Sequence, residues 1–240
     1  MVQSAIGGKS AAATDKCVVK TAVAGLRQRA DATRNRARII DAAQDAFIEQ
    51  GADVPLDEIA KRAGVGNATV YRHFPDRRAL VRGVVLAVME RAIGVATQAL
   101  AEEADPFEAL SRLVHDAVNW KIGALCPMLS EWTDLDEPEI FATRERLDVV
   151  VSTMIAGAQQ AGTLRTDVSS DDVMMAVAQL VRPFPGAGYD SLQPFVHRHL
   201  QLLLDGLRAP ARTALPGGPQ TLEDVRRECI LAATRRETRQ

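Results

Sequence analysis

The chain has 240 residues, 47% hydrophobic and 25% charged, a globular composition that excludes disorder of the whole chain and allows one large or two small domains. Its formal net charge of −2 averages two unlike parts, because residues 1–82 carry 14 Lys/Arg and 9 Asp/Glu whereas residues 83–240 carry 15 and 22. We therefore expect only the basic N-terminal part to bind a polyanion. No run reaches the roughly 18 uncharged apolar residues that cross a bilayer, and residues 1–30 lack a signal-peptide core, so we expect a cytoplasmic protein with no membrane partner.

The N-terminal third predicts a leader followed by four helices. Residues 1–30 are rich in Ala, Gly, Ser and Lys without a sustained period, so we expect a flexible basic leader. From Thr33 the apolar spacing becomes helical, and Gly51 is placed to end this helix. Two short helices are expected over about residues 56–63 and 67–74. Asp76 can cap a long fourth helix that keeps the 3.6-residue period to about Ala104.

The remainder is also predicted to be helical. Asp105 and Pro106 give a capping residue followed by Pro at the first helical position, which is a strong start signal. Pro127 breaks or kinks that segment. Further helices are expected over about residues 140–162, from Ser169 or Ser170 to near 183, and 191–207, before a Pro/Gly linker and a tail helix from about Thr221. No segment alternates in the manner of a strand, so the predicted fold class is all-α.

Residues 56–74 carry the pattern of two short helices joined by a tight turn. A helix-turn-helix needs a small residue where its helices cross, which Ala60 supplies, and a turn residue that accepts a positive φ, which Gly64 supplies. Apolar side chains stand at the positions that must pack between the two helices, at Val65, Val70 and Phe74. The solvent side of the second helix offers groups that can bind phosphates or base edges, at Asn67, Thr69, Arg72 and His73.

The run LDEIAKRAGVGNATVYRHFPDRRAL at residues 56–80 closely resembles the N-terminal DNA-binding domain of TetR-family transcriptional regulators. The resemblance covers about residues 33–82, and the body, with its Gly-Thr-Leu-Arg-Thr-Asp-Val stretch at 162–168, looks most like the SbtR-like subgroup. It implies an all-helical homodimer in which three N-terminal helices bind DNA, a fourth connects, and a divergent C-terminal domain binds a small effector and dimerises. On this basis four parts are expected: the leader 1–30, the DNA-binding domain 31–82 with its motif at about 55–74, the effector-binding and dimerisation domain 83–208, and the linker and tail helix 209–240.

The resemblance also implies roles for single residues. Thr69 and Tyr71 correspond to the usual phosphate and base contacts, His73 to a backbone contact, and Arg77 to a phosphate clamp at the start of the fourth helix. The full candidate set for DNA binding is Gly66, Asn67, Thr69, Tyr71, Arg72, His73, Arg77 and Arg34. Two departures matter: Ala68 replaces a common Gly, and Pro55 replaces a Thr that often caps the second helix and touches phosphate. We expect that contact to be lost or moved to the neighbourhood of Asp57.

Basic residues precede the first helix, at Arg27, Arg29, Arg34, Arg36 and Arg38. They could reach along the DNA backbone or into an adjacent minor groove, which would make binding more sensitive to salt. They could equally form a solubilising tail, since runs of charge are usually solvated faces. The sequence leaves these two interpretations open.

The body offers candidates for an effector pocket, at His115, Trp120, Met128, Trp132, Met154 and Met175. Each of them alone is better explained as simple core, so the sequence favours a pocket in the body without assigning its individual residues. We expect no cofactor and no metal, because Cys17, Cys126 and Cys229 are far apart and His197 and His199 have the wrong helical spacing for a shared ion.

The sequence therefore predicts a ligand-responsive repressor that binds a palindromic double-stranded DNA operator as a homodimer and is released by a small-molecule effector. An effector-independent or activating DNA-binding dimer remains open. We expect no enzyme, because no Gly-x-Ser-x-Gly elbow, metal cluster or phosphate loop is present in the sequence.

Overall fold

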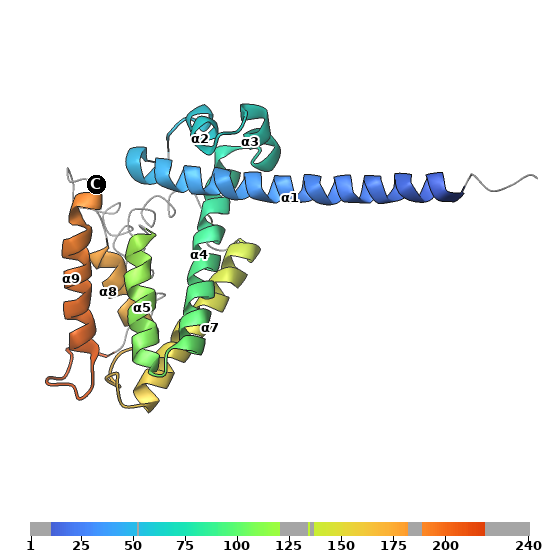
Figure 1. Ribbon diagram of the computed structural model, residues 1–240. Coiled ribbons are helices and arrows are strands. Elements are labelled where there is room, and N and C mark those ends of the chain that lie inside the picture. The colour runs from blue at the N-terminus through green and yellow to red at the C-terminus, as the bar shows by residue number, and fades with distance from the viewer. Residues whose placement is uncertain (1–10, 52, 121–133, 135–136, 182–188, 219–240) are drawn as a thin grey trace, which may run out of the picture.

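The computed structural model describes residues 11–51, 53–120, 134, 137–181 and 189–218. Within these ranges the chain forms eight helices and a single isolated bridge between Leu164 and Arg208, with no strand. The all-α prediction is therefore confirmed (Figure 1). The helices are α1 (Ala11–Gln50), α2 (Leu56–Ala63), α3 (Asn67–His73), α4 (Arg77–Glu102), α5 (Pro106–Asn119), α7 (Pro138–Gln160), α8 (Ser170–Leu180) and α9 (Tyr189–Leu207).

The first helix begins much earlier than expected. The apolar period starts at Thr33, but α1 starts at Ala11, so the expectation of a flexible leader is wrong for residues 11–29. This stretch contains many alanines, which have the highest helix propensity, and no proline. Figure 1 shows this end of α1 projecting away from the rest of the molecule. A helix end that projects in this way needs no apolar stripe, which is why periodicity did not reveal it.

The predicted helix boundaries in the body are largely correct, because they depend on local capping. The carboxylate of Asp76 accepts a hydrogen bond from the backbone N–H of Ala79 at 2.8 Å, and that of Asp105 accepts from Phe107 at 2.9 Å. Ser169, rather than Ser170, is the N-cap of α8 and forms a capping box with Asp172. The last helix starts at Tyr189, two residues before the expected Ser191. Pro127 and the expected tail helix lie outside the described residues.

Two hydrophobic cores lie at opposite ends of α4. The first, which we call the reader core, joins α2, α3, the C-terminal third of α1 and the first half of α4, from Ile39 to Val88. The second, the body core, joins the end of α4, from Ala96 on, to α5, α7, α8 and α9. The reader core thus continues beyond residue 82, where the sequence suggested a boundary. The transition between the two parts lies inside one continuous helix.

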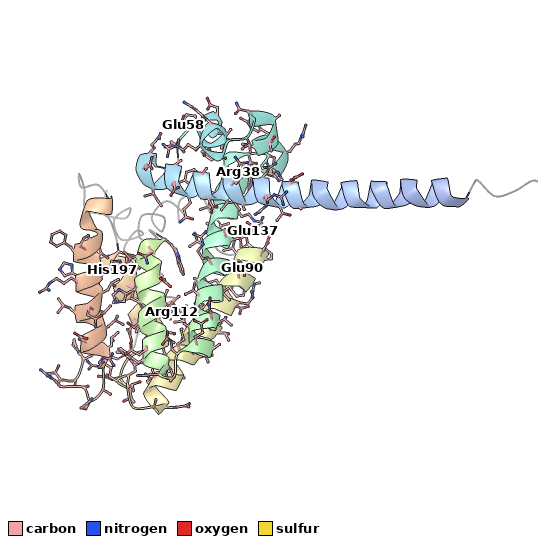
Figure 2. All side chains as sticks on the ribbon, viewed as in Figure 1. Arg38, Glu58, Glu90, Arg112, Glu137 and His197 are labelled. Carbon is pink, nitrogen blue, oxygen red and sulfur yellow. The ribbon has the colours of Figure 1, made fainter. Side chains whose placement is uncertain are left out.

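Ion pairs connect α4 to α7 along their length. Arg82 pairs with Glu137 and Glu139, and Arg146 holds Glu90 with two hydrogen bonds of 2.6 and 3.1 Å. Figure 2 labels Glu90 and Glu137 along this contact. These pairs are partly solvent-exposed, so they orient the two helices more than they stabilise them.

Candidate nucleic-acid interface

The turn between α2 and α3 has the geometry that the sequence predicted. Gly64 adopts φ +63° and ends α2, and the backbone N–H of Val65 donates to the carbonyl of Ala60 at 3.0 Å. Ala60 is 1% exposed and belongs to the same hydrophobic core as Val70 and Phe74. Pro55 precedes α2 and supplies no side-chain cap, as its lack of a polar group requires.

Close packing of Phe74 against α4 fixes the end of α3. A Cβ atom at Gly83 would lie 2.7 Å from the Cε1 atom of Phe74, so only glycine allows this approach. Gly83 lies outside the helix-turn-helix pattern in the sequence. Its one signal is a glycine within a strongly apolar helical run, which often marks a close contact.

Burial divides α3 into an inner and an outer face. Val70 and Phe74 are buried, four residues apart, and Thr69 and His73 flank them as half-buried side chains. The outer face consists of exposed residues, namely Asn67, Ala68, Tyr71 and Arg72, with exposed Gly66 as the N-cap. Tyr71 is 54% exposed, a large fraction for an aromatic side chain. The outer face therefore presents an amide, a phenol and a guanidinium, all of which can bind phosphates or base edges.

The basic residues around α3 have different environments. Arg77 is half-buried at the start of α4, and Arg34 is exposed on α1, where it pairs with Asp31. The guanidinium of Arg36 lies 5.1 Å from the ring centroid of Phe74, and Arg38 donates to the carbonyl of Gly64 at 3.2 Å. Figure 2 shows Arg38 on α1, below α3. Arg36 and Arg38 thus stabilise the helix-turn-helix directly, a role that the sequence did not predict.

A polar contact joins the reader core to the body. The side chain of Gln44 on α1 is 7% exposed and donates to the carbonyl of Trp120, at the end of α5, at 2.8 Å. Arg91 on α4 approaches Asp41 on α1 at 3.4 Å. The same residues, with Asp45 and Asn119, line a cavity of about 280 Å³. No local pattern marks Gln44, because its partner lies 76 residues away in the sequence.

His115, a predicted pocket residue, instead meets His197 between α5 and α9. Their Nδ1 atoms are 2.9 Å apart and their ring centroids 5.2 Å apart, with 22° between the planes (Figure 2 labels His197). The centroid distance is about the nitrogen distance plus two ring radii, so the rings meet edge to edge. One Nδ1 must then carry hydrogen and donate to the other. Burial, and secondarily the charge of His115, lower the pKa of His197 below its usual 6.5.

Lowering the pH is expected to weaken the contact between α5 and α9. Because the pKa of His197 is lower in the folded than in the unfolded protein, the unfolded protein takes up the proton first. The free energy of unfolding should therefore be highest above pH 6.5 and fall as the pH drops through the lowered pKa. Urea unfolding between about pH 5 and 8 measures this, and His197→Gln should flatten the profile. His199→Gln, an exposed position on the same helix, is the control; a wild-type profile in His197→Gln would contradict the assignment.

The body also contains a larger cavity, of about 1010 Å³, where the chain after α9 folds back on α8. Its apolar walls include Val173, Ala176 and Leu203, and its charged rim includes Asp205 and Arg212. Arg165 also lines it; this residue is 8% exposed, and its guanidinium donates to the carboxylate of Asp167 with hydrogen bonds of 2.6 and 2.8 Å. The hydrogen bonds from Arg165 lower the pKa of Asp167 to about 2.

Of the six predicted pocket residues, the four that the structure describes do not line this larger cavity. Met154 is fully buried in the body core, Met175 is half-buried on α8, and His115 pairs with His197. Trp120 lines the smaller cavity at the junction instead. Met128 and Trp132 lie outside the described residues. The assignment of these six residues to an effector site therefore stays a prediction.

Among the residues that the structure describes, no group of three or more His, Cys, Asp or Glu side chains is arranged to hold a metal ion. None of the helices in this part of the chain has the length and apolar character to cross a membrane.

Comparison with known proteins matches both parts of the chain. Residues 39–84 match the family model of bacterial regulatory proteins of the tetR family, and residues 105–209 match that of the transcriptional regulator SbtR-like C-terminal domain. The HTH-type transcriptional regulator SrpR of Pseudomonas putida is 44% identical over 57 residues, which are 23% of this chain and only 27% of that protein. The HTH-type transcriptional regulator TtgR, also of Pseudomonas putida, is 29% identical over 165 residues, 63% of this chain and 78% of that protein.

A solved structure matches across nearly its whole length. The TetR transcription regulatory protein from Mycobacterium vanbaalenii is 35% identical with a TM-score of 0.59, and the match covers 76% of this chain and 99% of that one. The two family models fall on the two cores described above, with the helix-turn-helix in the first. The chain therefore belongs to the TetR family and is a DNA-binding transcriptional regulator.

Proposed function

We propose that this protein is a repressor that binds a palindromic operator in the cytoplasm as a homodimer and is released by a small-molecule effector. The observation that carries the proposal is the outer face of α3. Asn67, Tyr71 and Arg72 are exposed there, while Val70 and Phe74 anchor the same helix from within. A helix held in this way can enter a major groove without losing its own packing.

Exposed apolar side chains on α8 and α9 support a homodimer. Met174 on α8 is 38% exposed, and Phe195 and Leu202 on α9 are each 60% exposed. Phe195 and Leu202 are seven residues apart, so they lie on one face of the helix. A stable interface needs about 800 Å² from each partner, and a face formed by two helices can supply it.

A two-fold dimer determines the symmetry of the operator. It would place two copies of α3 in successive major grooves, roughly 34–36 Å apart, so each half-site would be read by one protomer. The operator is then an imperfect palindrome, because both copies of α3 read the same bases in opposite directions.

The junction between reader and body offers a route for effector control. An effector that prefers one arrangement of the body shifts the dimer toward that arrangement, and it acts only through that difference in affinity. The bond from Gln44 to the carbonyl of Trp120 would transmit such a change to α1. A coupling of about 3 kcal/mol would weaken operator binding roughly a hundredfold. The 1010 Å³ cavity is the structural candidate for the effector site.

The test starts with selection of the operator from a random DNA pool. Tyr71→Ala should weaken binding of the selected operator by about 10- to 100-fold in a gel-shift titration, because one base contact is worth about 1–3 kcal/mol. The dimer, measured by analytical ultracentrifugation, should persist. Phe141→Ala, an exposed aromatic residue of the body, is the matched control. Wild-type affinity in Tyr71→Ala would remove α3 as the reading helix.

A second measurement separates the repressor from its rival, a DNA-binding dimer without an effector. Thermal-shift screening of a metabolite library should find a compound that raises the melting temperature and also releases the operator. Operator binding that no stabilising compound alters would favour the effector-independent dimer.

A further inference from the structure

The positive charge of the N-terminal part lies outside the helix-turn-helix. Residues 1–38 carry 8 Lys/Arg and 2 Asp/Glu, whereas residues 39–82 carry 6 and 7. Arg62, one of those six cations, is already paired with Glu49 and Glu58. The globule that carries α3 is therefore close to neutral, although DNA attracts its partners chiefly through positive charge.

Seven of these eight cations instead lie on the N-terminal part of α1, residues 11–38, which we call the arm. The match to the tetR family model begins at residue 39, and the reader core begins at the same residue, Ile39. From Ala30 to Arg38 every residue is exposed except half-buried Asn35. At 1.5 Å per residue the arm is roughly 40 Å long, about the length of 12 base pairs.

Basic positions on the arm repeat with helical spacing. Intervals of 4, 7, 7 and 4 residues place five of them on one face of α1, at Lys16, Lys20, Arg27, Arg34 and Arg38. We call these five positions the basic row. Its last member, Arg38, donates to the carbonyl of Gly64, in the turn that leads into α3. The basic row therefore starts at the reading helix and continues outward from it.

The arm points away from the face on which the protein is proposed to dimerise. Figure 1 shows the free end of α1 and the helix α9 on opposite sides of the molecule. In a two-fold dimer through α8 and α9, the two arms would thus point away from each other. Each would leave its half-site in the outward direction.

We propose that the arm binds the phosphates of the duplex that flanks each half-site, beyond the bases read by α3. This inference rests on the proposed operator binding. It chooses between the two interpretations that the sequence left open, a DNA contact and a solubilising tail. The arm supplies affinity and salt dependence and no base specificity, because its contacts are to phosphates.

The test combines a charge variant of the full chain with operators of two lengths. One duplex ends at the edge of the two half-sites, and the other carries about 15 additional base pairs on each side, longer than the arm. The variant replaces Lys16, Lys20 and Arg27, three members of the basic row, with Gln, which removes charge and keeps high helix propensity. Wild type should bind the long duplex more tightly than the short one. The variant should lose that preference, and its slope of log affinity on log salt should be shallower by up to about 5, because the two arms of the dimer lose six charges in all.

Matched controls and the remaining outcomes make the test decisive. Arg27→Gln alone should give about a third of the effect, whereas Arg144→Gln, which removes one charge from the body, should leave both slope and preference unchanged. Equal wild-type affinity for the two duplexes, or an unchanged slope in the three-residue variant, would overturn the arm's role. The Tyr71→Ala result would still support operator reading by α3. Failure of wild type to select any DNA would instead overturn the proposed function itself.

Discussion

Phe74→Ala is expected to destabilise the reader core by about 3–5 kcal/mol and to abolish operator binding. Phe74 is 2% exposed, approaches Gly83 of α4 and lies beneath the guanidinium of Arg36. Alanine would leave a cavity between α3 and α4 that a rigid helix pair fills poorly. The orientation of α3, and with it the outer face, would be lost even though the residues of that face are unchanged.

The two tryptophans allow this effect to be localised. Trp120 packs against the body core, and position 132 falls in the same part of the sequence. Helical circular dichroism should therefore show an early transition in Phe74→Ala, while the tryptophan fluorescence transition stays near its wild-type position. Phe74→Leu should recover most of the stability, because most of the buried volume is kept. Tyr71→Ala provides the contrast, with lost affinity and unchanged stability. A wild-type circular dichroism curve for Phe74→Ala would show that the ring is not an anchor.

Local signals explain why the helix-turn-helix could be predicted in detail. Ala60, Gly64, Val70 and Phe74 act within a few residues of one another, so their spacing alone specifies the turn and its buried side. Capping works in the same way at Asp76, where a carboxylate and an N–H three residues apart start a helix. Such features are present in the sequence before any tertiary contact forms.

Features that depend on distant residues could not be predicted. The His115–His197 contact joins positions 82 residues apart, and no local sequence pattern around either histidine indicates the other. The large cavity exists because the chain after α9 returns to Arg165, which donates to the carbonyl of Thr213 at 2.8 Å. The helical arm could not be predicted for a different reason. Its helicity comes from intrinsic propensity, whereas the apolar period that predicts a helix arises only where the helix buries one face.

Phe107→Ala is expected to destabilise the body core by about 3–5 kcal/mol, as the counterpart of the change in the reader. Phe107 is fully buried in the first turn of α5, and the guanidinium of Arg208 lies 4.2 Å from its ring centroid, so the ring joins α5 to the end of α9. The tryptophan fluorescence transition should now move to lower denaturant.

Operator affinity should also fall in Phe107→Ala, but through loss of the proposed dimer, so that a reader with its own intact core binds as a single half-site. Phe141→Ala, at an exposed aromatic position, should leave both transitions in place. If Phe74→Ala and Phe107→Ala each moved the fluorescence and circular dichroism transitions together, the two cores would unfold as one unit. Because α4 runs without a break from the reader core into the body core, such coupling would mean that this helix transmits the state of the body to α3 without an intermediate step.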